Sequence, residues 1–276
     1  MPELPEVETI VRELRPQLVG HRLGPVQMGT LPLRRRWSAS WEIALAGRQV
    51  REVWRRGKWI VLELDRSLHL VFHLGMTGQL TVMPSAEAAA PHTHLVSNLD
   101  LGGRQLRFRD IRRFGSVTLF GTRHELDEFF RVTSLGPEPF DLDRTYWRTR
   151  LAATNRSLKA VLLDQRVVAG VGNIYADESL FEASIHPARI AREVRPAQAE
   201  RLRQAVVTVL NRAIDKRGSS IRDYVGGSGQ PGQYQEEFRV YGRTGKPCMR
   251  CGRPIVRIRL AGRSTHFCSR CQRQRA

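Results

Sequence analysis

The sequence has few cysteines and few acidic residues for its length, and each shortage excludes a class of protein. Only four cysteines occur in 276 residues, all after residue 247. This excludes a chain-wide disulfide framework and favours a metal site in a reducing compartment. Lysine and arginine number 45 against 27 aspartates and glutamates, a formal net charge of +18. Such an excess indicates a polyanionic partner, and nucleic acid is the leading one.

The chain also lacks a long apolar run, a signal-like N-terminus, a lipidation motif and an internal repeat. The first three shortages disfavour the rival interpretation, a basic protein of a membrane surface. A chain of 276 residues is long enough for two modest domains with real cores. Nothing predicts an oligomer, so we expect a monomer without a membrane partner.

The first eight residues combine a potential nucleophile with carboxylates. If Met1 is removed, Pro2 presents a secondary amine, which forms a cationic iminium with an aldehyde carbon. An α-amino group titrates near 8 and a lysine near 10.4, so the terminal amine is more often unprotonated. At about 100° per residue, Glu3 and Glu6 fall beside an apolar helical stripe, at the boundary of core and solvent. That stripe contains Leu4, Val7, Val11, Leu14 and Leu18. Alternatively, these acids merely favour the dipole of the helix.

The next hundred residues have β-strand patterns punctuated by turns. Gly102-Gly103 is a strong hairpin signal. We therefore expect an antiparallel sandwich or barrel with the first helix packed against it. The expected strands span residues 49–56, 58–65, 68–73, 79–83, 95–101, 105–109 and 115–120.

Helical patterns follow a predicted linker within residues 124–145. Gly218 suits the end of a long amphipathic helix, and the stretch 218–237 is rich in glycine and serine. That stretch is either a flexible tether or a mobile active-site lid. The expected helices span residues 145–153, 157–164, 173–183 and 196–217.

The cysteines form two pairs of the pattern Cys-x2-Cys, separated by sixteen residues. Two such pairs supply four thiolates, which close the coordination sphere of a structural zinc ion. The segment between the pairs is predicted to be a β-hairpin, with Arg263 at its turn able to reach a phosphate. The four expected zinc ligands are Cys248, Cys251, Cys268 and Cys271.

Three glycine-containing turns are further candidates for contacts with nucleic acid. Gly170 and Gly172 precede a helix, whose exposed amides suit phosphate oxygens or merely form a tight turn. The turns at 73–78 and 110–115 carry Met76, Arg112 and Phe114. Those side chains suit wedges that enter a base stack, or they fill the sandwich core.

Taken in order, these motifs resemble those of bacterial formamidopyrimidine-DNA glycosylases over nearly the whole chain. The resemblance implies a bifunctional glycosylase and lyase that excises oxidised purines from duplex DNA by Schiff-base chemistry with β,δ-elimination, in the bacterial cytoplasm. It rests on Pro2–Glu8, His73–Gly78, Arg112–Gly115, Gly170–Tyr175, Val240–Arg243 and the four cysteines.

The resemblance also assigns roles to individual residues. Pro2 would attack C1′ of the damaged nucleotide, Glu3 would move protons at the sugar, and Glu6 would support the active site. Met76, Arg112 and Phe114 would fill the gap left by the flipped base, with Arg112 bonding the orphaned cytosine. Lys159 would lie near the lesion, although alone it resembles a solvated helix lysine. The positions that match phosphate-gripping residues are Lys58, which we also place in the active site, His73, Asn173 and Arg263.

The implied fold is α+β and multidomain, with three parts. Residues 1–133 would form a catalytic β-sandwich with an N-terminal helix, and residues 134–225 a helix-two-turn-helix DNA-binding domain. Residues 226–276 would hold the lid end and the zinc hairpin. Two departures from the family are Ile111, where proline is usual, and a lid unusually rich in glycine.

Two alternative functions fit part of the sequence. A glycosylase resembling endonuclease VIII, which removes oxidised pyrimidines, would share Pro2, Glu3 and the zinc hairpin. A catalytically inactive zinc-finger protein would use the helices and the hairpin only to hold DNA.

Overall fold

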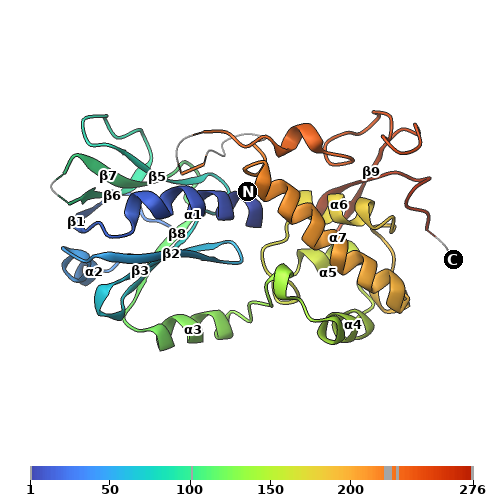
Figure 1. Cartoon of the computed structure of the whole chain (residues 1–276), viewed down its shortest axis with the longest axis horizontal. Coiled ribbons are helices and arrows are strands. Elements are labelled where there is room, and N and C mark those ends of the chain that lie inside the picture. Colours follow the sequence, from blue (N-terminus) through green and yellow to red (C-terminus); the bar gives the residue numbers. More distant parts are fainter. Residues whose placement is uncertain (1, 101, 221–225, 228–229, 275–276) are drawn as a thin grey trace. The chain divides into compact units, whose positions relative to one another are not determined.

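The computed structural model describes all residues except 1, 101, 221–225, 228–229 and 275–276. The chain divides into two compact units (Figure 1). The first comprises Met1–Thr133 and Lys216–Gln233, and the second Ser134–Asp215 and Tyr234–Ala276. Segment 216–233 thus returns to the first unit, and the three-part division expected from the sequence stays a prediction.

Two four-stranded antiparallel sheets form the centre of the first unit. One sheet has the order β1-β6-β7-β5 and the other β2-β3-β4-β8 (Figure 1). Apolar side chains of both sheets and of α1 (Leu4–Leu18) share one core. This confirms the predicted sandwich with its packed helix. The strands are β1 (Leu23–Met28), β2 (Val50–Arg56), β3 (Trp59–Leu64), β4 (His69–His73), β5 (Gly78–Pro84), β6 (Thr93–Leu99), β7 (Arg104–Asp110) and β8 (Ser116–Phe120).

Two short turns connect the sheets at the same end of the sandwich. One leads from β4 to β5 and the other from β7 to β8. Their flanking residues are register partners, because His73 pairs with Ser116 and Gly78 with Asp110. The topology therefore places the two turns side by side.

Helix α1 buries the apolar stripe expected from its spacing, with each stripe residue at most 1% exposed. Its acidic residues differ from expectation: Glu3 and Glu6 are 3% and 2% exposed, so neither lies at a solvent boundary. Glu3 is the N-cap residue, and its backbone N–H donates to Glu6 Oε2 over 2.8 Å. Capping by a glutamate in the first turn satisfies an amide that the helix itself leaves unpaired.

The second unit joins a helical cluster to a C-terminal hairpin. The long helix α7 (Pro196–Asp215) buries one apolar face against its neighbours, including Leu202, Val206 and Leu210. Trp147 Nε1 donates to Ala199 O over 2.9 Å, which ties α4 to α7. The other elements are α4 (Arg144–Ala152), α5 (Leu158–Leu163), α6 (Asn173–Glu182), β9 (Val256–Leu260) and β10 (Arg263–Phe267).

Some elements were not predicted from the sequence. These are β1, α2 (Ala39–Leu45), α3 (Arg123–Val132), part of which falls in the expected linker, and four short 3-10 helices. The latter are Asp65–Ser67, Pro139–Asp141, Ala191–Glu193 and Tyr234–Glu237. Within the described ranges, no helix is both long enough and apolar enough to span a bilayer.

The segment expected to be a lid or a tether lies partly outside the described residues. Its described ends meet, since Gln233 N donates to Lys216 O over 2.9 Å and Gly232 N to Ser220 Oγ over 2.8 Å. These bonds close the segment at its base within the first unit.

Candidate active site and zinc site

The start of α1 gathers the proposed nucleophile and its carboxylates in one turn of chain. Pro2, Glu3 and Glu6 are all buried. Glu6 Oε1 accepts hydrogen bonds from Ser219 N at 2.7 Å and Ser219 Oγ at 3.0 Å, while its other oxygen holds Glu3 N. Gly218 has a φ of +72°, and a Cβ there would lie 2.8 Å from the same carboxylate oxygen. Glu6 therefore fixes both the N-terminal residues and the start of the 216–233 segment.

His73 lies at the end of β4, with basic side chains around it. Burial, together with Lys58, Arg34 and Arg35 nearby, lowers the pKa of His73 to about 4. Its Nδ1 accepts the N–H of Gly75 over 3.1 Å. A neutral imidazole that accepts at Nδ1 carries its proton on Nε2, so His73 offers a hydrogen-bond donor without a charge. Lys58, which precedes β3, is 7% exposed.

The two sheet-connecting turns expose large side chains. Met76 is 37% and Phe114 45% exposed, so neither fills the core. The Arg112 guanidinium lies 4.7 Å from the centre of the Phe114 ring. The sequence-predicted trio thus lies on adjacent turns at one end of the sandwich.

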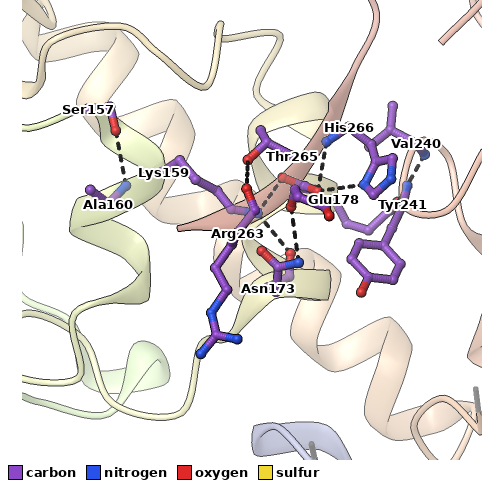
Figure 2. Close-up of polar contacts among 12 residues, drawn as sticks. Ser157, Lys159, Ala160, Asn173, Glu178, Val240, Tyr241, Arg263, Thr265 and His266 are labelled. Carbon is purple, nitrogen blue, oxygen red and sulfur yellow. Dashed lines mark hydrogen bonds and ion pairs between the residues drawn. The ribbon is translucent and has the colours of Figure 1, made fainter. Parts of the chain in front are cut away.

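In the second unit, Lys159 is wholly buried rather than solvated. Figure 2 shows its side chain among the polar contacts of this unit. Its Nζ lies 2.5 Å from Asp177 Oδ1 and donates to Asn173 O over 3.0 Å. The other oxygen, Asp177 Oδ2, accepts from His266 N at 2.9 Å and His266 Nδ1 at 3.1 Å. Asn173 Nδ2 in turn donates to Ser264 O over 3.1 Å. These bonds join α5, α6 and β10.

Arg263 is the first residue of β10 and is exposed. In Figure 2 its side chain extends away from the hydrogen-bonded cluster, which leaves the guanidinium accessible. The hairpin turn before it has two residues with positive φ, Ala261 at 48° and Gly262 at 71°. That geometry suits a tight two-residue hairpin turn.

Sequence reasoning missed Asp177, Glu178 and His266. Glu178 is 2% exposed and accepts the backbone N–H groups of Arg239, Val240 and Tyr241 over 2.8–3.0 Å. Burial raises the pKa of Glu178. A weak signal existed, because the apolar residues of α6 do not gather on one face; residues 174–181 are all buried, so Asp177 and Glu178 have no solvent face.

The four cysteines come together at the base of the hairpin. Their sulfur atoms all lie within 4.8 Å of one another, and Cys271 N donates to Cys268 Sγ over 3.4 Å. Four sulfur atoms at this spacing suit a tetrahedral zinc site, whose coordination the protein alone completes. Cysteine sulfur is a soft ligand, and a site closed by four of them holds the ion for structure.

Comparison with known proteins decides the family. The formamidopyrimidine-DNA glycosylase N-terminal domain matches residues 1–117, and the H2TH domain of the same glycosylase matches 135–225. A zinc finger found in FPG and IleRS matches 245–274. A protein from Moorella thermoacetica named formamidopyrimidine-DNA glycosylase is 48% identical over 264 residues, 94% of this chain and 95% of that protein. The chain belongs to the formamidopyrimidine-DNA glycosylase family.

Other members of the family agree with this assignment. A formamidopyrimidine-DNA glycosylase from Desulforamulus reducens is 43% identical over 277 residues, covering 99% of each chain. A Lactococcus lactis FPG mutant in complex with DNA containing Fapy-dG superposes with a TM-score of 0.92 at 35% identity. A complex of the same organism's Fpg with DNA containing an abasic site gives a TM-score of 0.91 at 34% identity. In both, the match covers 99% of this chain and 100% of the other. The family and the cysteine cluster confirm one structural zinc ion.

The first prediction concerns the neutral state of His73. Its folded pKa of about 4 lies below the unfolded value of about 6.5, so the unfolded chain binds the proton more readily between those pH values. The free energy of unfolding must therefore fall as pH drops through that window. In His73→Gln this fall should be smaller, as measured by urea unfolding at several pH values. His124→Gln, at an exposed position, should keep the wild-type slope; an unchanged slope in His73→Gln would contradict the prediction.

The second prediction concerns zinc. Removing the ion with a chelator should release one zinc per chain and unfold residues 245–274, because folding and metal binding are coupled in such modules. Limited proteolysis should then cut first in that segment, and DNA affinity should fall with it. Zinc should restore both properties and calcium neither. Unchanged protease resistance after stoichiometric zinc release would contradict a structural role.

Proposed function

We propose that this chain is a bifunctional DNA glycosylase and abasic-site lyase that excises oxidised purines in base excision repair. Its substrates are duplex DNA containing 8-oxoguanine or formamidopyrimidines. Family membership over the whole chain carries this proposal. The Lactococcus lactis relatives in complex with Fapy-dG DNA and abasic-site DNA support both the substrate and the product of base release.

The nucleophile is the Pro2 nitrogen after Met1 has been removed. In the Met1–Pro2 peptide bond this nitrogen is a tertiary amide and has no nucleophilic lone pair. As a free amine it attacks C1′, the N–C1′ bond forms, and the bond from C1′ to the base breaks as the base leaves with a proton. Opening of the sugar ring at O4′ then gives an iminium between Pro2 and C1′.

The iminium makes the hydrogen at C2′ acidic. Loss of that proton expels the 3′ phosphate by β-elimination, and a second proton loss expels the 5′ phosphate by δ-elimination. Water finally hydrolyses the C–N bond and frees Pro2. Glu3, next to the nucleophile, moves these protons and protonates O4′. Glu6 acts by holding Glu3 N and Ser219 in place, and Lys58 binds the phosphate of the reacting nucleotide.

The DNA is held by positive charge and by donors. The net charge of +18 suits binding to a phosphate backbone. Donation from His73, Asn173 and Arg263 fixes the phosphates beside the lesion. Extrusion of the damaged base costs a few kcal/mol of stacking, which the wedge side chains Met76, Arg112 and Phe114 offset. Arg112 bonds the orphaned cytosine.

Lys159 is buried and supports this DNA-binding surface indirectly. Its buried ammonium orients the first turn of α6 through Asn173 O and Asp177. We also propose that the protein acts as a monomer in the bacterial cytoplasm, without a membrane partner. No observation favours activity on oxidised pyrimidines or an inactive DNA-binding role.

The third prediction tests the nucleophile. Borohydride reduces an iminium to a stable amine, so incubation with a duplex carrying 8-oxoguanine opposite cytosine should trap a covalent adduct at residue 2, located by peptide mass spectrometry. The matched control is the same protein with an uncleaved N-terminal tag, in which the Pro2 nitrogen stays an amide. That control should bind DNA without trapping. An adduct on Lys58 instead would remove Pro2 from the mechanism.

The fourth prediction tests Glu3. Glu3→Gln should keep duplex affinity, measured by fluorescence anisotropy, because the amide replaces an acid close to the DNA. Base release should fall by roughly a hundredfold to ten-thousandfold, the range typical of general acid–base catalysis. Glu8→Gln removes an acid from the same helix, where it pairs with Arg12 and Arg55, and should excise normally. Near-normal excision by Glu3→Gln would exclude it as the proton carrier.

A further inference from the structure

The two sheet-connecting turns, β4–β5 with Met76 and β7–β8 with Arg112 and Phe114, are called the wedge turns below. They contact each other through their backbones. Gly75 has a φ of +59°, and a Cβ there would lie 2.5 Å from both Gly115 N and Phe114 C. A Cβ at Gly115 would lie 2.7 Å from His73 O and 2.9 Å from Asp110 Oδ2. Only glycine permits this approach. Any group that fixes one turn therefore constrains the other.

Asp110, the last residue of β7, lies between these turns and is 0% exposed. Its Oδ1 accepts from Thr77 Oγ1 at 2.5 Å and from Arg112 N at 3.2 Å, and its Oδ2 accepts from Gly115 N at 2.7 Å. Thr77 Oγ1 also accepts from Arg112 N over 3.1 Å. Among the residues that the structure describes, no lysine or arginine forms an ion pair with this carboxylate. It is therefore held by directed hydrogen bonds, which a buried charge requires.

Each of the three donors to Asp110 belongs to a wedge residue or to the residue directly after one. Thr77 directly follows Met76, the second donor is the amide of Arg112 itself, and Gly115 directly follows Phe114. The backbone of Asp110 is fixed as well, since His94 Nε2 donates to Asp110 O over 2.9 Å. Arg113, between two wedge residues, has a φ of +56°, a costly conformation for a residue with a side chain. The surrounding bonds hold the turn in that shape.

We infer that Asp110 and Thr77 are positioning residues for base extrusion, which set how Met76, Arg112 and Phe114 together enter the stack. This inference rests on the proposed function. Both side chains are buried, Thr77 at 8% and Asp110 at 0% exposure. The pair acts by fixing the backbone that carries three exposed side chains, which form no side-chain hydrogen bonds with the residues that the structure describes. Selectivity for the base opposite the lesion depends on it, because Arg112 must meet that base at a fixed distance.

Thr77 offers the sharper test, because one variant removes its hydroxyl and another keeps it. Thr77→Val has the same shape without the donor, and Thr77→Ser keeps the donor. Asp110→Asn complements them: an amide has one acceptor oxygen, so it cannot accept from both Gly115 N and the Thr77–Arg112 side. Asp127→Asn, at an exposed position on α3, controls for loss of one negative charge.

Three substrates separate positioning from folding. Two are duplexes with 8-oxoguanine opposite cytosine or opposite adenine, and the third is a single strand with a preformed abasic site, which has no opposing base. Thr77→Val and Asp110→Asn should lower the rate of base release from the cytosine duplex on the order of tenfold, as expected for one lost hydrogen bond to a charged group. They should also lower the cytosine-to-adenine ratio. Thr77→Ser and Asp127→Asn should match wild type, and all variants should cleave the single strand at the wild-type rate.

The outcomes distinguish this inference from the proposed function. Equal excision by Thr77→Val and Thr77→Ser, with unchanged base selectivity, would overturn the positioning role alone. An equal loss on the single-stranded abasic substrate would also overturn it, because the defect would then lie in the active site or in folding. A wild-type protein that releases no base and forms no borohydride adduct would overturn both.

Discussion

Backbone amides that a helix or sheet leaves without a partner need other acceptors, and this protein supplies them from buried carboxylates. Glu6, Asp110, Asp177 and Glu178 are each at most 2% exposed. Glu6, Asp177 and Glu178 accept amides from segments far away in sequence, and Asp110 accepts amides of the turn that follows it. An unpaired amide inside a protein is costly, and so is an unpaired carboxylate. A hydrogen bond between a buried amide and a buried carboxylate removes both costs, and it also fixes the backbone of the segment that carries the amide.

The distribution of charge follows from the same constraint. The chain has an excess of basic residues, with a net charge of +18, while Glu6, Asp110, Asp177 and Glu178 are buried. A carboxylate exposed beside a phosphate would repel it, whereas a buried one whose oxygens face amides or Lys159 is largely neutralised locally. The buried acids thus fix these turns without placing exposed negative charge beside a bound polyanion.

Much of the fold follows from local pattern, and the missed parts have identifiable causes. Alternation between residues 49 and 120 located seven strands, because each has one face in a shared core. Strand β1 was missed because Gly24 and Pro25 suppress the pattern, which an edge strand tolerates. The Cys-x2-Cys spacing located the zinc ligands, and the glycine-containing motifs located the turns at 73–78 and 110–115. Asp177 and His266 lie 89 residues apart and meet only through tertiary packing, which no local pattern encodes.

Because residues 216–233 belong to the first unit, that unit is encoded by two separated stretches of the gene. The chain passes between units three times, after residues 133, 215 and 233. A fragment ending at residue 133 would lack Ser219, whose amide and hydroxyl both donate to Glu6 Oε1 in the first turn of α1. Recombination between relatives therefore has to exchange two separated stretches together, which links the inheritance of the N-terminal sandwich to that of the segment after α7.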